Sequence, residues 1–447
     1  MKAIRFNEAL RLAAEAAVSA SLGQQHKVLL IRDVYGRLRF AVNIERQDFD
    51  LAVAQKLDQA QKRLGAFSAT GGVLFRDDFA APDTLFDHVD WHETLVPGLL
   101  LEDGSVSPEF SIQLLDRQIV GQYWLRTEPE DTGYIHPPRV VFYGIKGGVG
   151  RSTALAMLAY RLARNGKRVL LLDFDLESPG LSGLLLPAER VATYGLVDWF
   201  VEDAVGQGDE ILRDLIADSP LADNLTGSIR IAPAMGQGES AYLAKLARVY
   251  ADVPHAGAVP EQFAARIQRL VRLLEVQEVP DIVLIDSRAG LHDLAAISIT
   301  GLASLALLFA TDTTQNWEGY RQLFGHWQGR PEVLRHVRSR LAIVQALFPE
   351  SDQAERATRF RQNACDLFST TLYDQIPAGE PTPLDAFTFG LDDEDAPHYP
   401  WQVRWSARLQ EFDPLLPVER GGVGDADIDA AFGPFFKEVT SMVLGDS

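Results

Sequence analysis

The residues best suited to chemistry form a glycine-rich run, YGIKGGVGRST, from Tyr143 to Thr153. The run follows an apolar stretch typical of a buried strand, and it opens an amphipathic helical pattern that Gly166 ends. In a strand–loop–helix unit, glycines let backbone N–H groups converge on phosphate oxygens, and the helix dipole adds positive potential. A hydroxyl at the start of the helix can bind Mg²⁺. The run therefore predicts a loop that binds a polyphosphate.

This loop is not an ordinary Walker A motif, GxxxxGK[ST]. Ile145 stands where that motif has its first glycine, and Arg151 stands where it has its lysine. A dinucleotide fingerprint, GxGxxG, fits less well, because Thr153 takes the place of the third small residue. A turn that merely packs a helix on a strand would not need Lys146 beside three glycines. Phosphate binding is therefore the favoured interpretation.

The run resembles the deviant Walker A loop of ParA/MinD-type P-loop ATPases, KGGxGK[ST], and in particular its KGGVGR variant. The resemblance extends over roughly 140–381 and implies that Lys146 is the signature lysine of the family. It also implies that Ser152 is a Mg²⁺ ligand and that Arg151 replaces the usual lysine. The nucleotide-binding residues implied in this way are Lys146, Gly147, Gly148, Val149, Gly150, Arg151, Ser152 and Thr153.

Two more apolar runs end in aspartates where this family has carboxylates. VLLLDFD ends with Asp173 and Asp175, and DIVLID ends with Asp286. The resemblance implies that Asp175 orients the attacking water and that Asp286 holds Mg²⁺ through water. The alternative is a solvated carboxylate at the end of a strand, which is favoured more for Asp173 than for the others. Arg288 stands where the family has a proline. For Arg288 we favour the role of a solvated loop residue over that of a sensor of the γ-phosphate.

The base of the nucleotide is not identified by the residues themselves. The family commonly places an asparagine that reads adenine after a late strand, whereas the strand-like run LAIVQALFPE offers Gln345. ATP rather than GTP, with Mg²⁺ as the metal, is therefore implied by the resemblance alone.

The elements that must position these residues alternate between apolar strands and helices from Val140 onward. The strand-like runs are VVFYGI, VLLLDFD, IRIAPA, DIVLID, LALLFATD and LAIVQAL. Apolar strands separated by helices predict an α/β fold, here a P-loop NTPase with a mostly parallel sheet and helices on both faces. From about Glu380 the chain is acidic and rich in loops, and it closes with a predicted helix near 430–444 that docks on the protein itself or on a partner.

The first part of the chain has a different pattern and resembles no family. A helical stripe runs from Ala9 to Leu22, and a second helix over 53–64 is ended by Gly65. Strand-like runs occupy 27–31, 38–42, 73–75 and 112–124. We therefore predict a small α+β domain over 1–125, a polar linker over 126–139 and the P-loop ATPase domain over 140–447.

Composition excludes several other classes. The chain has 447 residues and a formal net charge of −20, which makes bulk binding to DNA or to anionic membranes unfavourable. A single cysteine, Cys365, excludes an internal disulfide and a cysteine-only metal site, and it suits a reducing cytoplasm. We expect neither a signal peptide nor a membrane span. His88 and His92 lie four residues apart, but exposed or capping histidines are favoured over metal ligands.

The function implied by the resemblance is an ATP-dependent dimerisation switch, and we expect slow hydrolysis because Arg151 replaces the usual lysine. Two subunits would close on two ATP·Mg²⁺, with Lys146 reaching across to the phosphates of the partner. The implied catalytic residues are Lys146, Asp175 and Arg151, and an unidentified protein partner would be bound through residues 1–125. The alternatives left open are a regulator that binds nucleotide without hydrolysing it, a ParA-like ATPase that positions DNA, and a ligase or synthetase on the same fold.

Overall fold

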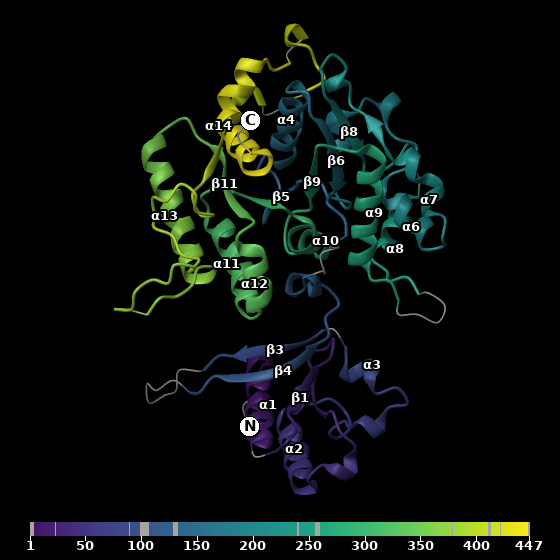
Figure 1. Cartoon of the computed structure of the whole chain (residues 1–447), viewed down its shortest axis with the longest axis vertical. Coiled ribbons are helices and arrows are strands. Elements are labelled where there is room, and N and C mark those ends of the chain that lie inside the picture. Colours follow the sequence, from purple (N-terminus) through teal and green to yellow (C-terminus); the bar gives the residue numbers. More distant parts are fainter. Residues whose placement is uncertain are drawn as a thin grey trace. The chain divides into compact units, whose positions relative to one another are not determined.

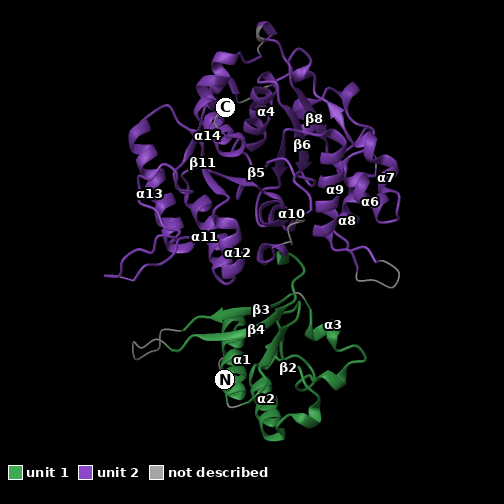
Figure 2. Cartoon of the chain, viewed as in Figure 1, with its two compact units in different colours: residues 1–122 green, residues 123–447 purple. Residues whose placement is uncertain are grey.

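The structure is a computed structural model that divides into two compact units, Met1–Gln122 and Tyr123–Ser447 (Figure 2). The division falls slightly before the boundary predicted at 125, because Tyr123 and Trp124 are buried in the core of the second unit. The residues described by the structure are 4–22, 24–88, 90–98, 107–127, 133–238, 241–254, 260–377, 379–409, 413–420 and 422–445.

The first unit is a four-stranded mixed sheet with helices α1 (Phe6–Ser21) and α2 (Leu51–Arg63) (Figure 1). Its strands, in sheet order, are β2 (Leu38–Val42), β1 (Val28–Arg32), β4 (Phe110–Asp116) and β3 (Trp91–Val96). Strands β1 and β2 form the predicted hairpin, β4 runs parallel to β1, and β3 runs antiparallel to β4. Helix α1 packs on this sheet through its alanines, and α2 packs on α1, so the predicted α+β character is confirmed.

Two details of the first unit differ from the sequence-based expectation. Residues 73–75 form no strand and contribute only an isolated bridge between Ala41 and Leu74. Strand β3 was not predicted. Alternate side chains of a strand point to the same face, so His92 shares a face with Val96, and both are buried there. The expectation that His92 is exposed or a cap is therefore wrong. A short helix, α3 (Asp83–Phe86), precedes β3.

The second unit is built on an eight-stranded sheet that is parallel except for its last strand, which confirms the predicted fold. The strands, in sheet order, are β12 (Trp401–Arg404), β11 (Leu341–Phe348), β10 (Leu305–Ala310), β5 (Arg139–Gly144), β9 (Ile282–Ser287), β6 (Arg168–Phe174), β8 (Ser228–Ala232) and β7 (Ala217–Asp218). Strands β5, β9 and β10 are buried along their whole length, as expected for apolar strands covered on both faces.

Helices cover both faces of this sheet, and each face has its own hydrophobic core (Figure 1). One face carries α4 (Arg151–Arg164), α5 (Leu181–Leu185) and α14 (Asp425–Leu444). The other carries α6 (Leu196–Asp203), α7 (Gly208–Ile211), α8 (Tyr242–Val249), α9 (Phe263–Glu278), α10 (Asp293–Ile297), α11 (Thr314–Gln328), α12 (Pro331–Arg338) and α13 (Gln353–Thr371).

The C-terminal helix packs on the protein itself. Docking on the protein itself and docking on a partner were the two alternatives predicted for this helix. Helix α14 begins at Asp425, earlier than predicted, and it contacts α4 and the unpredicted edge strand β12. Phe432, Phe435 and Phe436 carry its apolar face into the core that α4 shares. No helix in the described part of the chain is long and apolar enough to cross a membrane.

Candidate nucleotide-binding site

The glycine-rich run forms a loop between the end of β5 at Gly144 and the start of α4 at Arg151. Gly148 and Gly150 have φ angles of +74° and +79°, in the left-handed region that favours glycine over residues with a Cβ atom. A Cβ atom added to Gly147 or Gly148 would meet no atom within 4 Å. The glycines therefore let the loop curve around open space, where phosphate groups can approach the backbone.

Strand order brings the predicted carboxylates to this loop. Strand β5 pairs with β9, and β9 pairs with β6, so the carboxyl ends of the three strands meet at one edge of the sheet. In the β6–β9 register Asp173 lies opposite Asp286. Open α/β sheets bind ligands at such an edge.

Ser152 and Asp286, the two residues implied as Mg²⁺ ligands, are in direct contact. The Ser152 hydroxyl donates a hydrogen bond of 2.6 Å to Oδ2 of Asp286. The other oxygen, Oδ1, is buried and has no hydrogen-bond partner among the described residues. Burial raises the pKa of this carboxyl, and the nearby Arg151 guanidinium opposes the rise. A water bound to a divalent cation would supply the donor that Oδ1 lacks.

Arg151 points inward, and only 7% of its side chain is exposed. Its Nη2 atom lies 3.5 Å from Oδ2 of Asp175, and its Nε atom lies 4.0 Å from Oδ1 of Asp286. Its Nη1 atom is buried without a hydrogen-bond partner in the described ranges. The arginine therefore serves as a counter-ion for the two carboxylates, a role that the sequence did not reveal.

The two aspartates that follow β6 have different environments. Asp173 is fully buried, and its oxygens accept N–H bonds of 3.3 Å from Asp175 and from Leu181, so it shapes the loop that follows β6. Burial raises the pKa of Asp173 well above its usual value, and Asp286 adds to the rise. Burial also raises the pKa of Asp175 to about 6, although Arg151 opposes this effect. Asp173 is therefore a structural residue, while Asp175 faces the cation.

The loop after β9 touches the start of the phosphate loop. The Gly290 N–H donates to the Gly144 carbonyl at 3.0 Å, and the Tyr143 hydroxyl donates to the Gly290 carbonyl at 3.2 Å. The same loop carries Arg288, whose Nη1 lies 2.5 Å from Oε1 of Glu177 on the loop after β6. Glu177 was missed by sequence reasoning, because it looks like any other acidic loop residue.

The remaining predicted residues occupy varied positions. Lys146 is exposed at the start of the loop, Thr153 is half-buried in the first turn of α4, and Val149 is buried in the core beneath the loop. Gln345 is buried inside the sheet, where its Oε1 accepts a hydrogen bond of 3.1 Å from Gln402. Within the ranges described, no three His, Cys, Asp or Glu side chains gather as a metal site.

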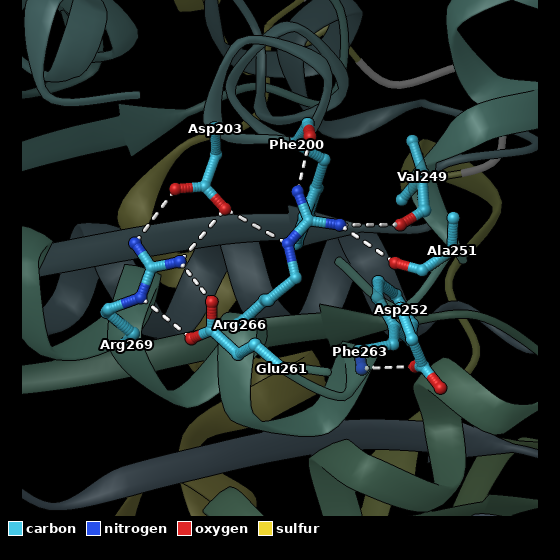
Figure 3. A network of polar contacts seen from close by, with 9 residues as sticks. All are labelled: Phe200, Asp203, Val249, Ala251, Asp252, Glu261, Phe263, Arg266 and Arg269. Atoms are coloured by element: carbon cyan, nitrogen blue, oxygen red, sulfur yellow. Dashed lines mark hydrogen bonds and ion pairs between the residues drawn. The ribbon is translucent and has the colours of Figure 1, made fainter. Parts of the chain in front are cut away.

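A buried polar network centred on Arg266 lies between α6, α9 and the segment after α8 (Figure 3). The fully buried Arg266 on α9 donates to the Phe200 carbonyl, to Asp203 at 3.0 Å and to the Ala251 carbonyl at 3.1 Å. Arg269 adds two hydrogen bonds of 2.9 Å to Asp203. The network joins α6, α9 and the segment after α8 into one body.

Two tyrosines connect this body to the loop after β6. The Tyr242 hydroxyl at the start of α8 donates to the Leu176 carbonyl at 2.5 Å. The Tyr250 hydroxyl, just after α8, donates to Glu177. The loop that carries Asp175 is thus hydrogen-bonded to residues at the two ends of α8.

The arrangement suits a polyphosphate with a divalent cation. It combines a glycine loop open to backbone approach, a helix N-terminus, a hydroxyl–carboxylate pair with one unpartnered oxygen, and a buried guanidinium. Such a site can neutralise and position phosphoryl groups, and it needs no covalent nucleophile.

Comparison with known proteins agrees with this geometry. Residues 140–314 match the family model of the CobQ/CobB/MinD/ParA nucleotide binding domain. The antiactivator FleN of Pseudomonas aeruginosa is 30% identical over 181 residues, which are 40% of this chain and 53% of FleN. The septum site-determining protein MinD of Escherichia coli is 35% identical over 89 residues, 20% of this chain and 29% of MinD. The chromosome-partitioning ATPase Soj of Thermus thermophilus is 50% identical over 52 residues, 12% of this chain and 21% of Soj.

Residues 140–314 therefore form a nucleotide-binding domain of this family, and the resemblance of the chain to ParA/MinD-type P-loop ATPases is confirmed. The match spans about half the length of FleN and less of the other two relatives. The first unit, Met1–Gln122, lies outside the residues that match the family model.

Proposed function

We propose that this protein is an ATP-dependent dimerisation switch that hydrolyses ATP slowly and controls a protein partner. The observation that carries the proposal is the Ser152–Asp286 hydrogen bond of 2.6 Å beside the open glycine loop. A hydroxyl and a carboxylate with one unpartnered oxygen are a suitable pair of ligands for the Mg²⁺ of a bound nucleotide.

Each predicted residue then has a defined task. The backbone N–H groups of the loop would bind the phosphates, Ser152 would hold Mg²⁺, and Asp286 would hold it through water. Bound Mg²⁺ would neutralise the charge that develops on the phosphoryl oxygens. Asp175 orients the attacking water, and Arg151 contacts the phosphates. Lys146, which is exposed, reaches the nucleotide of a second subunit.

The partner would be bound through the first unit. That unit has its own hydrophobic core and lies outside the family match, so it is the part of the chain free to carry a signal specific to this protein. The relative FleN is named an antiactivator, which is a task performed on another protein. A regulatory task of that kind agrees with a switch whose output is binding rather than chemistry.

A regulator that binds nucleotide without hydrolysing it is the second candidate. Arg151 favours it, because its guanidinium is paired with the carboxylate proposed to orient water. Positioning of DNA is disfavoured by the net charge of −20, although the relative Soj is named a chromosome-partitioning ATPase. Micromolar binding to nonspecific DNA at physiological salt, with a steep salt dependence, would favour that function instead.

Light scattering with Mg²⁺ and ATP tests the switch. Lys146→Ala should bind ATP as a monomer but fail to dimerise, because the cation that reaches across is missing. Asp175→Ala should accumulate an ATP-bound dimer that does not turn over. Lys56→Ala, at an exposed lysine of α2, is the matched control and should behave like the wild type. If both site variants also behaved like the wild type, the switch would be refuted.

A further inference from the structure

Arg288 lies on the loop between the Mg²⁺ carboxylate and the phosphate loop. It follows Asp286 by two residues, and Gly290, two residues further on, donates to the carbonyl of Gly144. Its loop is therefore held against the start of the phosphate loop. The side chain is 32% exposed, so it is free to change its rotamer. Arg288 therefore lies on a loop next to the phosphate loop, but in this structure its guanidinium is paired with Glu177.

Its present partner, Glu177, makes its polar contacts through one oxygen, Oε1, while Oε2 is buried without a hydrogen-bond partner among the described residues. Oε1 of Glu177 accepts from the Tyr250 hydroxyl and lies 3.5 Å from Nε2 of His292, in addition to the 2.5 Å contact with Arg288. Glu177 would therefore keep polar partners if Arg288 moved away. The cost of releasing Arg288 is lowered because Oε1 keeps the Tyr250 hydroxyl as a donor.

The phosphate site itself needs another cation. Asp173, Asp175 and Asp286 meet at the edge where the phosphates would bind, and Arg151 is already shared between two of these carboxylates. A triphosphate carries more negative charge than a diphosphate, so a further cation beside Mg²⁺ and Arg151 would stabilise its terminal group. A guanidinium matches phosphate oxygens with two parallel N–H bonds, which a lysine cannot do.

We propose that Arg288 leaves Glu177 when a nucleoside triphosphate binds and contacts its terminal phosphate, so that the Glu177–Arg288 pair distinguishes ATP from ADP. The inference rests on the proposed nucleotide site and adds a specificity-determining residue to it. Glu177 is the positioning residue, since it holds the guanidinium at the edge of the site until a phosphate competes for it.

Calorimetric titration with ADP and with a non-hydrolysable ATP analogue, both with Mg²⁺, tests this inference. Arg288→Gln should weaken binding of the ATP analogue roughly ten- to hundredfold while leaving ADP binding within about twofold, because only the triphosphate has the terminal group. Arg288→Lys should retain part of the preference. Glu177→Gln should strengthen binding of the ATP analogue several-fold, since Arg288 is no longer held by a charge.

Two further variants make the result specific. The double variant Glu177→Gln, Arg288→Gln should equal Arg288→Gln alone, because Glu177 acts only through the arginine. Arg168→Gln removes a comparable ion pair with Asp281 at the opposite ends of β6 and β9, and it should change neither affinity.

The outcomes separate the inference from the function on which it rests. If the wild type binds neither nucleotide, the nucleotide site is refuted. If it binds both, and Arg288→Gln weakens ADP and the ATP analogue equally or neither of them, the nucleotide site stands and the role of Arg288 is overturned.

Discussion

The guanidinium of Arg151, at the start of α4, lies 3.5 Å from the carboxylate of Asp175, which directly follows β6. The residue in the place of the usual P-loop lysine is therefore paired with the residue proposed to orient the attacking water. A lysine ammonium is a compact charge that can follow a phosphate, whereas a guanidinium prefers fixed, forked contacts. This pairing gives a physical reason to expect slow hydrolysis.

Arg151→Lys should therefore raise kcat for ATP hydrolysis. Releasing Asp175 from a misplaced charge-assisted contact is worth about 1.5–3 kcal/mol, which corresponds to a rate increase of roughly one to two orders of magnitude. The affinity for ATP should change little, since the loop backbone supplies most of the phosphate contacts. Steady-state phosphate release measures kcat. A fall in kcat would make Arg151 a tuned catalytic residue and would weaken the case for a regulator without hydrolysis.

Gly148→Val should abolish ATP binding. The φ angle of +74° strains any residue with a Cβ atom, and the added methyl groups would enter the open space in front of the loop. Gly325→Val is the matched control, because Gly325 is exposed on α11 and an added Cβ atom there also meets nothing within 4 Å. Equilibrium dialysis with ATP reports the difference. Unchanged affinity in the Gly148 variant would disprove the assignment of the loop.

Asp175→Asn should stabilise the nucleotide-free protein above pH 6 and lose this advantage toward pH 4. The pKa of Asp175 is raised to about 6 by burial, so the folded state binds the proton more tightly than the unfolded state. The free energy of unfolding therefore falls as the pH rises through this window. Removing the charge should add about 1 kcal/mol at pH 8, a value discounted because the carboxylate is partly solvated.

Urea denaturation at pH 5 and pH 8 checks the Asp175 prediction. Asp223→Asn should shift stability in the opposite direction, because the hydrogen bond from Arg190 lowers the pKa of Asp223 in the folded state. If Asp175→Asn were less stable than the wild type at pH 8, the attraction of Arg151 would outweigh the cost of burial.

Arg266→Met should cost about 3–5 kcal/mol of stability, since it breaks a buried pair and leaves carbonyl groups without a donor. The side chain is fully buried, and its partners lie on α6 and on the segment after α8 (Figure 3). Arg269→Met should cost clearly less, because 37% of that side chain is exposed and Asp203 keeps Arg266. Denaturation midpoints of the two variants test this order, and equal losses would contradict it.

The sequence predicted the parts of the site that are encoded locally. The strand–loop–helix around Gly148 has its own periodicity and glycine spacing, so its location and its neighbouring apolar strands could be derived from residues close together in the chain. Asp286 was identified because it ends an apolar run, and the structure brings it into contact with Ser152.

The parts that escaped prediction depend on contacts between distant residues. Arg151 and Asp175 belong to different elements, and Glu177 meets Arg288 only because β6 and β9 are neighbours in the sheet. Strand β12 is a short piece at the sheet edge in an acidic, proline-rich segment, and its four alternating residues, WQVR, are too few to mark a strand. Strand β3 was obscured because its polar residues His92 and Thr94 share the inner side with Val96, whereas the apolar Leu95 is exposed.

The position of Trp124 gives the molecule a built-in optical reporter. Its indole ring contacts Tyr143, the residue that hydrogen-bonds the loop of Arg288, at a centroid distance of 5.9 Å, and it also contacts Trp327 at 6.0 Å. A change in that loop on nucleotide binding would alter the surroundings of this aromatic pair without any attached dye. Intrinsic tryptophan emission could therefore follow each turnover of the site in real time, and Trp124→Phe would identify the source of the signal.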